Sequence, residues 1–116
     1  MELAGKYDIT IEQGAGFELP ITFRADGDRV DLTGCAARMQ ARAKIGAAEA
    51  LIELTTENGG IELGGTDGTV TLSVSAAGTA ALDFTKAVYD LEIIPAAGES
   101  YRLLEGYVFL SREVTR

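Results

Sequence analysis

The chain has 116 residues, of which 47% are hydrophobic, and its 18 acidic and 10 basic side chains give a formal net charge of -8. This size suffices for one domain with its own core, and the apolar content excludes a disordered chain. The acidic balance argues against non-specific binding to nucleic acid, which needs a positive field. No apolar run reaches the length of a membrane helix. We therefore expect neither nucleic acid nor membrane as a partner.

Residue types that commonly carry catalysis or bind metals are scarce. The absence of histidine removes histidine-based triads and most catalytic zinc sites. The single cysteine, Cys35, lies in an apolar run and is expected to be a small buried side chain rather than a nucleophile. One cysteine also excludes an internal disulfide, which mildly favours assembly inside a cell. We expect no enzyme activity, no catalytic residue, no cofactor and no metal.

The N-terminal part predicts two strands with a period of two. Residues 6–12 alternate between apolar and polar side chains, as a half-buried strand does. Their apolar face is formed by Tyr7, Ile9 and Ile11. Residues 13–16, with two glycines, interrupt the alternation as a bulge or tight turn. Residues 17–23 resume it, and Pro20, which cannot donate to a ladder, predicts an edge strand.

Residues 25–28 contain Asp-Gly, a strong signal for a hairpin turn. The acidic cluster around this turn raises the question of a calcium site, with Asp26, Asp28 and Asp31 as possible ligands. An EF-hand-type loop needs an oxygen ligand at its fifth position and glycine at its sixth. Here Val30 and Asp31 hold those positions. We expect turn chemistry and no calcium.

Residues 35–44 combine a high helix propensity with a period of two. Because period outranks propensity, we predict a strand. Its polar face carries a local basic stripe, and with the following loop (residues 45–49) it forms the candidate interface Arg38, Gln40, Arg42, Lys44 and Ile45. The simpler interpretation is a solvated face whose charges pair with carboxylates on the neighbouring strand. The functional interpretation is a docking surface.

Three more strands are predicted in the middle of the chain, at residues 50–56, 61–63 and 69–75. Turns at residues 57–60 and 64–68 separate them, and their glycines suit positive φ. A single helical turn follows over residues 75–82, with Ser75 as its N-cap. Leu82 and Phe84 are expected to close one end of the core.

The strongest alternation lies near the C-terminus and predicts a hairpin of residues 87–94 and 101–110. The inward face of its first strand is formed by Ala87, Tyr89, Leu91 and Ile93. Asp90 and Glu92 fall on the opposite face. The returning strand is apolar enough to be central in its sheet.

Seven or eight short strands with regular turn signals and one short helical turn predict an all-β fold, an antiparallel β-sandwich with Greek-key links. A small closed barrel is the alternative. We expect one domain over residues 1–116, with residues 1–5 and 111–116 flexible.

Four segments resemble a known family in their order and spacing. They are Tyr7-Asp8-Ile9-Thr10-Ile11-Glu12-Gln13-Gly14, Val30-Asp31-Leu32-Thr33-Gly34, Gly68-Thr69-Val70-Thr71-Leu72 and Val88-Tyr89-Asp90-Leu91-Glu92. The chain is similar to small virion proteins of tailed bacteriophages and resembles the N-terminal domain of phage baseplate upper proteins. This resemblance implies an Ig-like β-sandwich that fastens receptor-binding machinery to the tail, and it supplies no catalytic residues. Such baseplate proteins continue into fibre or receptor-binding regions, which this sequence does not include.

The leading hypothesis is a structural virion protein in the tail or baseplate, an adaptor between larger virion components that is assembled in the host cytoplasm. Its partners would be other virion proteins, with homo-oligomers in the assembled particle as a further expectation. A capsid decoration protein is a close variant. A carbohydrate-binding module is the alternative from another class, and we expect it less because the few aromatic residues lie mostly at inward positions. An enzyme would need two carboxylates across a cleft.

Overall fold

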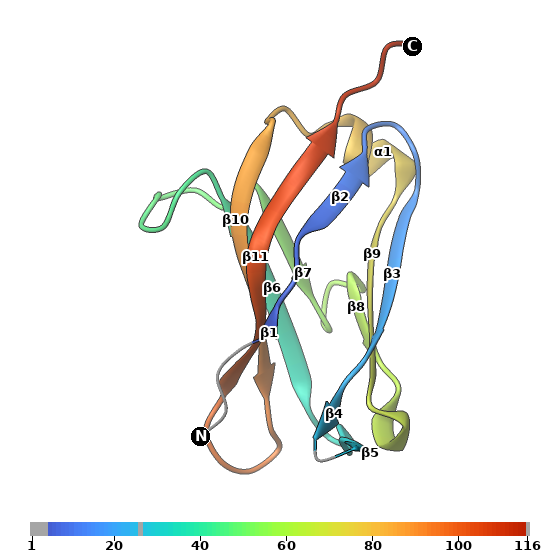
Figure 1. Cartoon of the computed structure of the whole chain (residues 1–116), viewed down its shortest axis with the longest axis vertical. Coiled ribbons are helices and arrows are strands. Elements are labelled where there is room, and N and C mark those ends of the chain that lie inside the picture. The colour runs from blue at the N-terminus through green and yellow to red at the C-terminus, as the bar shows by residue number, and fades with distance from the viewer. Residues whose placement is uncertain (1–4, 26, 116) are drawn as a thin grey trace.

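The computed structural model describes residues 5–25 and 27–115 and shows two β-sheets packed face to face (Figure 1). The larger sheet has the order β1-β11-β10-β6-β7, with β2 also paired to β11. Its strands are β1 (Gly5–Lys6), β2 (Ile9–Glu12), β6 (Ala36–Arg42), β7 (Ile52–Thr55), β10 (Lys86–Ile94) and β11 (Tyr101–Ser111). The smaller sheet, in the order β3-β9-β8, contains β3 (Phe17–Thr22), β8 (Ile61–Leu63) and β9 (Thr69–Val74).

Short elements complete the described chain. They are the two-residue strands β4 (Arg24–Ala25) and β5 (Asp28–Arg29), the 3-10 turn η1 (Gly65–Asp67) and the helix α1 (Ala76–Ala80). The predicted β-sandwich is confirmed. Within the described residues, the sheet partners follow the order of an immunoglobulin-like sandwich, in which the last two long strands lie at the centre of one sheet.

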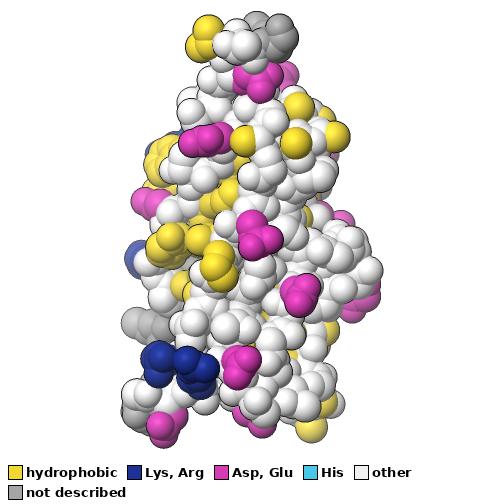
Figure 2. Space-filling model, turned by 90° about the vertical axis from the view of Figure 1, so that its right-hand side faces the viewer, with side chains coloured by type: hydrophobic (Ala, Val, Ile, Leu, Met, Phe, Trp, Pro, Cys, Tyr) yellow, Lys and Arg dark blue, Asp and Glu magenta, His cyan; other side chains and the backbone are white. Residues whose placement is uncertain are grey.

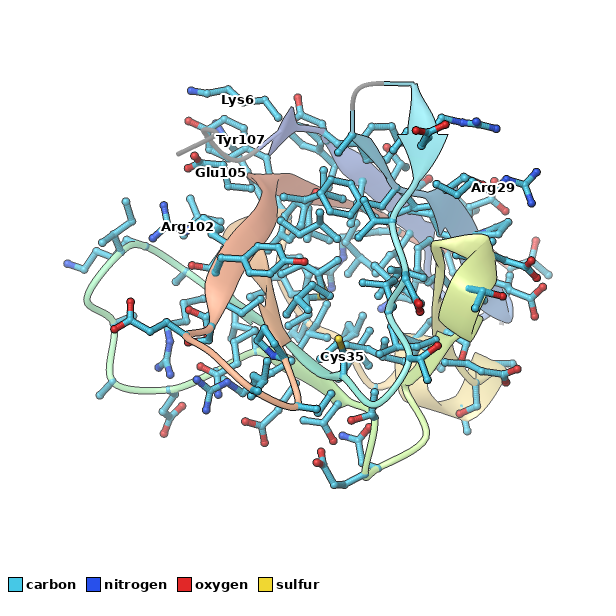
Figure 3. All side chains as sticks on the ribbon, turned by 90° about the horizontal axis from the view of Figure 1, so that it is seen from below. Lys6, Arg29, Cys35, Arg102, Glu105 and Tyr107 are labelled. Carbon is cyan, nitrogen blue, oxygen red and sulfur yellow. The ribbon has the colours of Figure 1, made fainter. Side chains whose placement is uncertain are left out.

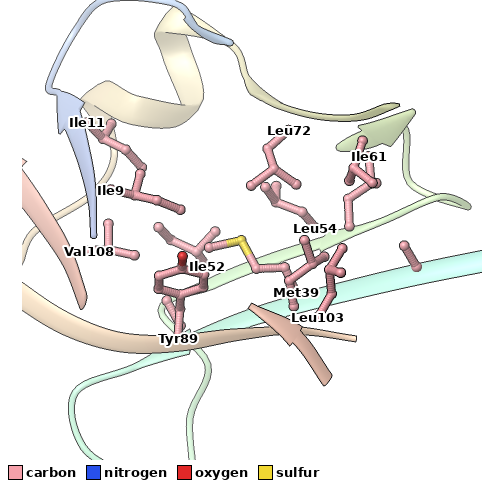
Figure 4. Packing of buried hydrophobic residues seen from close by; sticks show 14 of the residues in the cluster. Ile9, Ile11, Met39, Ile52, Leu54, Ile61, Leu72, Tyr89, Leu103 and Val108 are labelled. Carbon is pink, nitrogen blue, oxygen red and sulfur yellow. The ribbon is translucent and has the colours of Figure 1, made fainter. Parts of the chain in front are cut away.

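The core lies between the sheets and draws on both of them. Figure 4 shows Met39, Tyr89 and Val108 of the larger sheet pointing toward Leu72 and Ile61 of the smaller sheet. The inward residues of β10 are at most 4% exposed: Ala87, Tyr89, Leu91 and Ile93. The predicted hairpin is therefore confirmed together with its inward face. As expected, β11 is central, between β10 and the N-terminal strands.

The ambiguous segment of residues 35–44 forms β6, so the choice of strand over helix is confirmed. Ala37, Met39 and Ala41 are buried, while Arg38 on the other face is exposed. Alanine has a high helix propensity, but here it fills inward positions between two neighbouring strands, where packing outweighs propensity. β6 pairs with β10 on one side and with β7 on the other.

The N-terminal strand differs from its prediction in two ways. It is divided into β1 and β2, and both parts pair with β11 in parallel. Ile9 and Ile11 are buried as predicted, but the inward position predicted for Tyr7 is wrong, because its side chain is 47% exposed. The reason lies in bonds to distant parts of the chain: the Asp8 carboxylate accepts a hydrogen bond from Tyr107 N (3.0 Å), and the Tyr7 carbonyl accepts one from the Tyr89 hydroxyl. The chain leaves the regular ladder there.

Strand β3 lies at a sheet edge, as Pro20 predicted, because it pairs with β9 alone among the described strands. The turn at residues 13–16 carries the chain from the larger sheet to the smaller one, and Gly14 adopts a positive φ of 88° there. The predicted hairpin after β3 is formed by β4 and β5. Asp26 of its turn lies outside the described residues.

The predicted N-cap is confirmed at α1, where Ser75 Oγ accepts a hydrogen bond from Gly78 N (3.0 Å). Thr79 of this helix is fully buried and ties the helix to the turn after β2. Its hydroxyl accepts from Gly14 N (3.0 Å) and donates to Ala15 O (2.8 Å). Leu82 packs against the end of the core, as expected, and so does Phe84.

The two ends of the chain were expected to be flexible over residues 1–5 and 111–116. Residues 1–4 and 116 lie outside the described residues. Gly5 belongs to β1 and Ser111 to β11. The following Arg112 forms an ion pair with Asp83 (3.0 Å), and Glu113 N donates to Gln13 Oε1 (2.9 Å). The beginning of the polar tail is therefore bonded to the domain.

Candidate functional site

A groove of about 780 Å³ crosses the outer face of the larger sheet, and we call it the outer groove. It extends from β1 over β11 and β10 to β6, and the loop between β6 and β7 borders it through Ile45 and Gly46. Seen from below, Lys6, Tyr107, Glu105 and Arg102 lie together on this outer side, away from Arg29 (Figure 3). Side chains alternate between the two faces of each strand. The apolar residues therefore face the core, and the polar residues between them face the groove.

Most of the predicted interface residues line the outer groove. Arg38, Gln40 and Arg42 contribute from β6, and Ile45 follows from the loop. Lys44 does not line the groove, although its side chain is exposed. Ile45 is 90% exposed, an unusual position for a large apolar side chain. The sequence therefore identified one wall of this groove, whereas the walls formed by β1, β10 and β11 were not proposed.

The basic stripe is not a free positive surface. Arg38 forms an ion pair with Glu92 on β10 (3.0 Å). Gln40 donates to a Glu53 carboxylate oxygen on β7. Arg42 donates to Ala47 O and to Gln40 Oε1, both at 2.8 Å. The simpler interpretation, pairing with carboxylates on neighbouring strands, thus describes Arg38 and Gln40, while Arg42 holds the loop beside the groove.

Charges of both signs balance within the outer groove. Its four basic residues are Lys6, Arg38, Arg42 and Arg102, and its four acidic residues are Asp8, Asp90, Glu92 and Glu105. The whole chain carries a net charge of -8, so the excess acidic charge lies elsewhere. A neutral, mixed-charge region on an acidic protein suits contact with another protein, since it removes the long-range repulsion that a charged face would impose.

Asp90 occupies the middle of the groove floor. It lies opposite Gln40 on β6 and Glu105 on β11. Arg102 reaches both carboxylates, with Nε 3.4 Å from Asp90 Oδ2 and Nη1 3.7 Å from Glu105 Oε2. Burial raises the pKa of Asp90 above its usual value, against the opposing effect of the Arg102 charge. At Asp90 the effect of burial therefore exceeds that of the nearby arginine.

Aromatic side chains extend the outer groove toward β2. Tyr7 and Tyr107 line it and are 47% and 41% exposed. The Lys86 ammonium lies 4.1 Å from the centre of the Tyr107 ring, and the Phe109 ring centre is 6.0 Å from that of Tyr107. The expectation that most aromatics face inward is wrong, because four of the chain's eight are 37–47% exposed: Tyr7, Tyr101, Tyr107 and Phe109. Strand register decides which aromatic side chains are exposed, and register cannot be read from the sequence.

The acidic turn has the structure expected of turn chemistry. Asp31 Oδ1 accepts a hydrogen bond from Thr33 N (2.9 Å). Hydrogen bonding to the Thr33 side chain, and then to its backbone N–H, lowers the pKa of Asp31. In the part of the chain that the structure describes, no three potential metal-ligating side chains lie together. Cys35 is a free thiol that is partly buried against the core.

No model of a protein family and no curated protein matches this chain. Among the described residues, no helix is both long and apolar enough to span a membrane.

Proposed function

We propose that this chain is a non-enzymatic structural protein of a tailed-phage virion, an adaptor in the tail or baseplate that attaches one virion protein to another. The outer groove would be its docking surface. The observation that carries the proposal is the composition of that groove, where arginine and exposed tyrosine meet balanced carboxylates. Arginine and tyrosine are the residues that protein interfaces favour, and they dominate binding energy when a partner excludes water from them.

The charge network supports binding rather than catalysis. Arg102 holds Asp90 and Glu105, and Arg38 holds Glu92. Side chains fixed in this way present a pre-formed polar surface, which lowers the entropy lost on docking. The phage context itself rests on the resemblance of the strand and turn segments, and the groove supplies the means of attachment.

The first experiment is the copy number of the chain in purified phage particles, measured by quantitative mass spectrometry against the major shell protein. A low copy number supports a tail or baseplate adaptor. A copy number close to that of the shell protein moves the chain to the capsid as a decoration protein. Absence from particles overturns the virion proposal.

The docking surface is tested separately with Arg38→Glu combined with Arg42→Glu. Both residues line the groove, and the first change places a second carboxylate beside Glu92, which alters the charge of the proposed docking surface. We expect the variant to fold but to be lost from particles. The matched control is Arg29→Glu with Arg112→Glu, which removes two ion-paired arginines outside the groove. Equal incorporation of both double variants would exclude the outer groove as the attachment site.

A second candidate function is carbohydrate binding, which the exposure of Tyr7 and Tyr107 beside paired charged groups favours. Aromatic faces stack on sugar rings, and planar polar side chains bond their hydroxyls. A glycan array probed with the purified chain separates the two functions. Glycan binding that Tyr107→Ala abolishes would support the carbohydrate module. If no glycan is bound, the adaptor remains as the proposed function.

A further inference from the structure

A second opening lies on the side of the sandwich and meets the outer groove at Arg102. It is a cleft of about 750 Å³ between the end of β3 with the β4–β5 hairpin and the beginning of β11, and we call it the side cleft. Its apolar walls are formed by Ile21, Phe23 and Val30 on one side and by Tyr101, Leu103 and Leu104 on the other.

The inward side chains of β3 are incompletely covered. Phe17, Leu19, Ile21 and Phe23 alternate toward the core, yet all of them are only partly buried. The equivalent residues of β10 are at most 4% exposed. Figure 2 shows hydrophobic side chains gathered along one edge of the smaller sheet's outer face, above a group of basic side chains. The two sheets therefore do not close over this side of the core.

The main chain of β3 is open on the same side. In an antiparallel pair the N–H and C=O of one residue point the same way, alternately toward and away from the partner. Phe23 N donates to Gly68 O (2.7 Å), beside β9, so the groups of Glu18, Pro20 and Thr22 point away from β9. No described strand lies on that side. Glu18 and Thr22 offer N–H donors there, while Pro20 offers a carbonyl.

We propose that the β3 edge and the side cleft together accept an extended segment of a partner protein as an added strand. Main-chain bonds to Glu18, Pro20 and Thr22 would align the segment, and its apolar residues at alternate positions would enter the side cleft. Arg24 and Arg102 line the cleft, and Arg102 is already ion-paired with Asp90 and Glu105, so Arg24 is the cation left to receive an acidic residue of the segment. The segment should therefore carry an acidic residue at the end that lies beside Arg24. This site shares Arg102 with the outer groove, and its other lining residues are its own.

A second copy of this chain fits the edge poorly. When two β3 edges pair in antiparallel fashion, each Pro20 occupies a position where the other strand needs a donor, so hydrogen bonds are lost in both copies. Each copy also carries a net charge of -8, which opposes self-association. The occupant is therefore a different chain.

The test uses a displayed library of random eight-residue peptides, panned against the full chain. We expect enriched peptides with apolar residues at alternate positions and an acidic residue near one end. When such a peptide is added, the largest changes in amide NMR chemical shift should occur in β3 and at the beginning of β11. The key variant is Glu18→Pro with Thr22→Pro, which removes the two outward N–H donors in the manner of Pro20 and spares the ladder to β9. It should bind about tenfold more weakly, the factor that corresponds to 1.4 kcal/mol.

Two further variants keep the test decisive. Arg24→Glu changes an exposed side chain and should weaken the acidic peptides about tenfold even if the double-proline variant fails to fold. Arg38→Glu with Arg42→Glu should leave peptide binding unchanged. The proposal is overturned if no peptide prefers the native chain to Arg24→Glu, or if the outer-groove variant abolishes binding. It also fails if binding requires deletion of residues 1–4, because the side cleft would then belong to the chain's own N-terminal segment.

Discussion

Asp90 and Glu105 face each other across the β10–β11 pair, and Arg102 bridges both carboxylates. Like charges directly opposite in a sheet are destabilising, so the arginine converts a repulsive pair into a three-membered network. The three residues line the outer groove, and their charges contribute both to the stability of the hairpin and to the charge of that groove.

Replacing the bridging arginine should expose the repulsion. We expect Arg102→Ala to lower the free energy of unfolding by about 1 kcal/mol at neutral pH, a small effect because all three side chains are partly exposed to solvent. The loss should shrink as the pH falls and the carboxylates take up protons. Urea unfolding at several pH values checks this, with Arg112→Ala as control, since its partner Asp83 lies outside the strands and so faces no carboxylate across a strand pair. A loss that is independent of pH would contradict the charge mechanism.

The raised pKa of Asp90 predicts a pH dependence of stability. Burial is its main cause, so above its usual value of 3.8 the folded state holds a proton that the unfolded state has lost. Stability should therefore fall as the pH rises from 3.8 through the folded-state pKa. Asp90→Asn should remove this fall and be at least as stable as the native chain at pH 7, and the pH-dependent difference should vanish below pH 3.8. Thermal unfolding of both proteins across this range measures the effect, and a less stable variant at pH 7 would contradict it.

The hydroxyl of Tyr89 holds the N-terminal strand through the Tyr7 carbonyl. Tyr89→Phe keeps the ring in the core but leaves that carbonyl without its donor, so we expect a loss of about 1–2 kcal/mol in unfolding free energy. Hydrogen exchange at the Tyr7 amide, which donates to Glu105 O (3.0 Å), should accelerate. Tyr107→Phe is the control, because that tyrosine is 41% exposed and its change should cost less than about 0.5 kcal/mol. Equal stability of the two variants would show that the Tyr89 bond is unimportant.

Gly106 faces Tyr89 across the hairpin and leaves room for the N-terminal segment. A Cβ at this position would lie 2.9 Å from the Tyr7 carbonyl carbon and closer still to its oxygen. Because those atoms belong to the main chain, Gly106→Ala should force β1 away from β11 and cost about 1–3 kcal/mol. Gly16→Ala is the matched control, with no atom within 4 Å of the added carbon. Denaturant unfolding compares them, and a tolerated Gly106→Ala would contradict this close approach.

The sequence predicted those features that depend on side-chain alternation or on the chemistry of one residue. The period of two placed Met39 inward despite the helix propensity around it, and the missing N–H of Pro20 placed β3 at an edge. Features that depend on register were not predicted. Tyr7 continues the alternation of its strand, yet it is exposed where the chain leaves the ladder. There the Tyr7 carbonyl accepts a hydrogen bond from Tyr89, and the neighbouring Asp8 carboxylate accepts one from Tyr107 N. No local sequence pattern contains these bonds.

The candidate site was predicted in part for the same reason. Arg38 and Arg42 share a face in any β6 strand, so the stripe followed from the sequence. Whether that stripe is free or paired depends on which residues lie opposite. Glu92 lies opposite Arg38, and the two residues are separated by 54 positions in the chain. Such long-range pairing is set by the whole topology.

The parallel pairing of β2 with β11 has a consequence for the order of events during synthesis. Ile9 pairs with Val108, so the first strands emerge from the ribosome long before their partner exists. Contacts of such large sequence separation slow folding, and the outer groove cannot form without them, since Lys6 and Tyr107 both line it. A nascent chain that lacks β11 therefore lacks the finished groove that we propose as the docking surface. This topology would restrict docking to molecules whose last long strand has been made and folded.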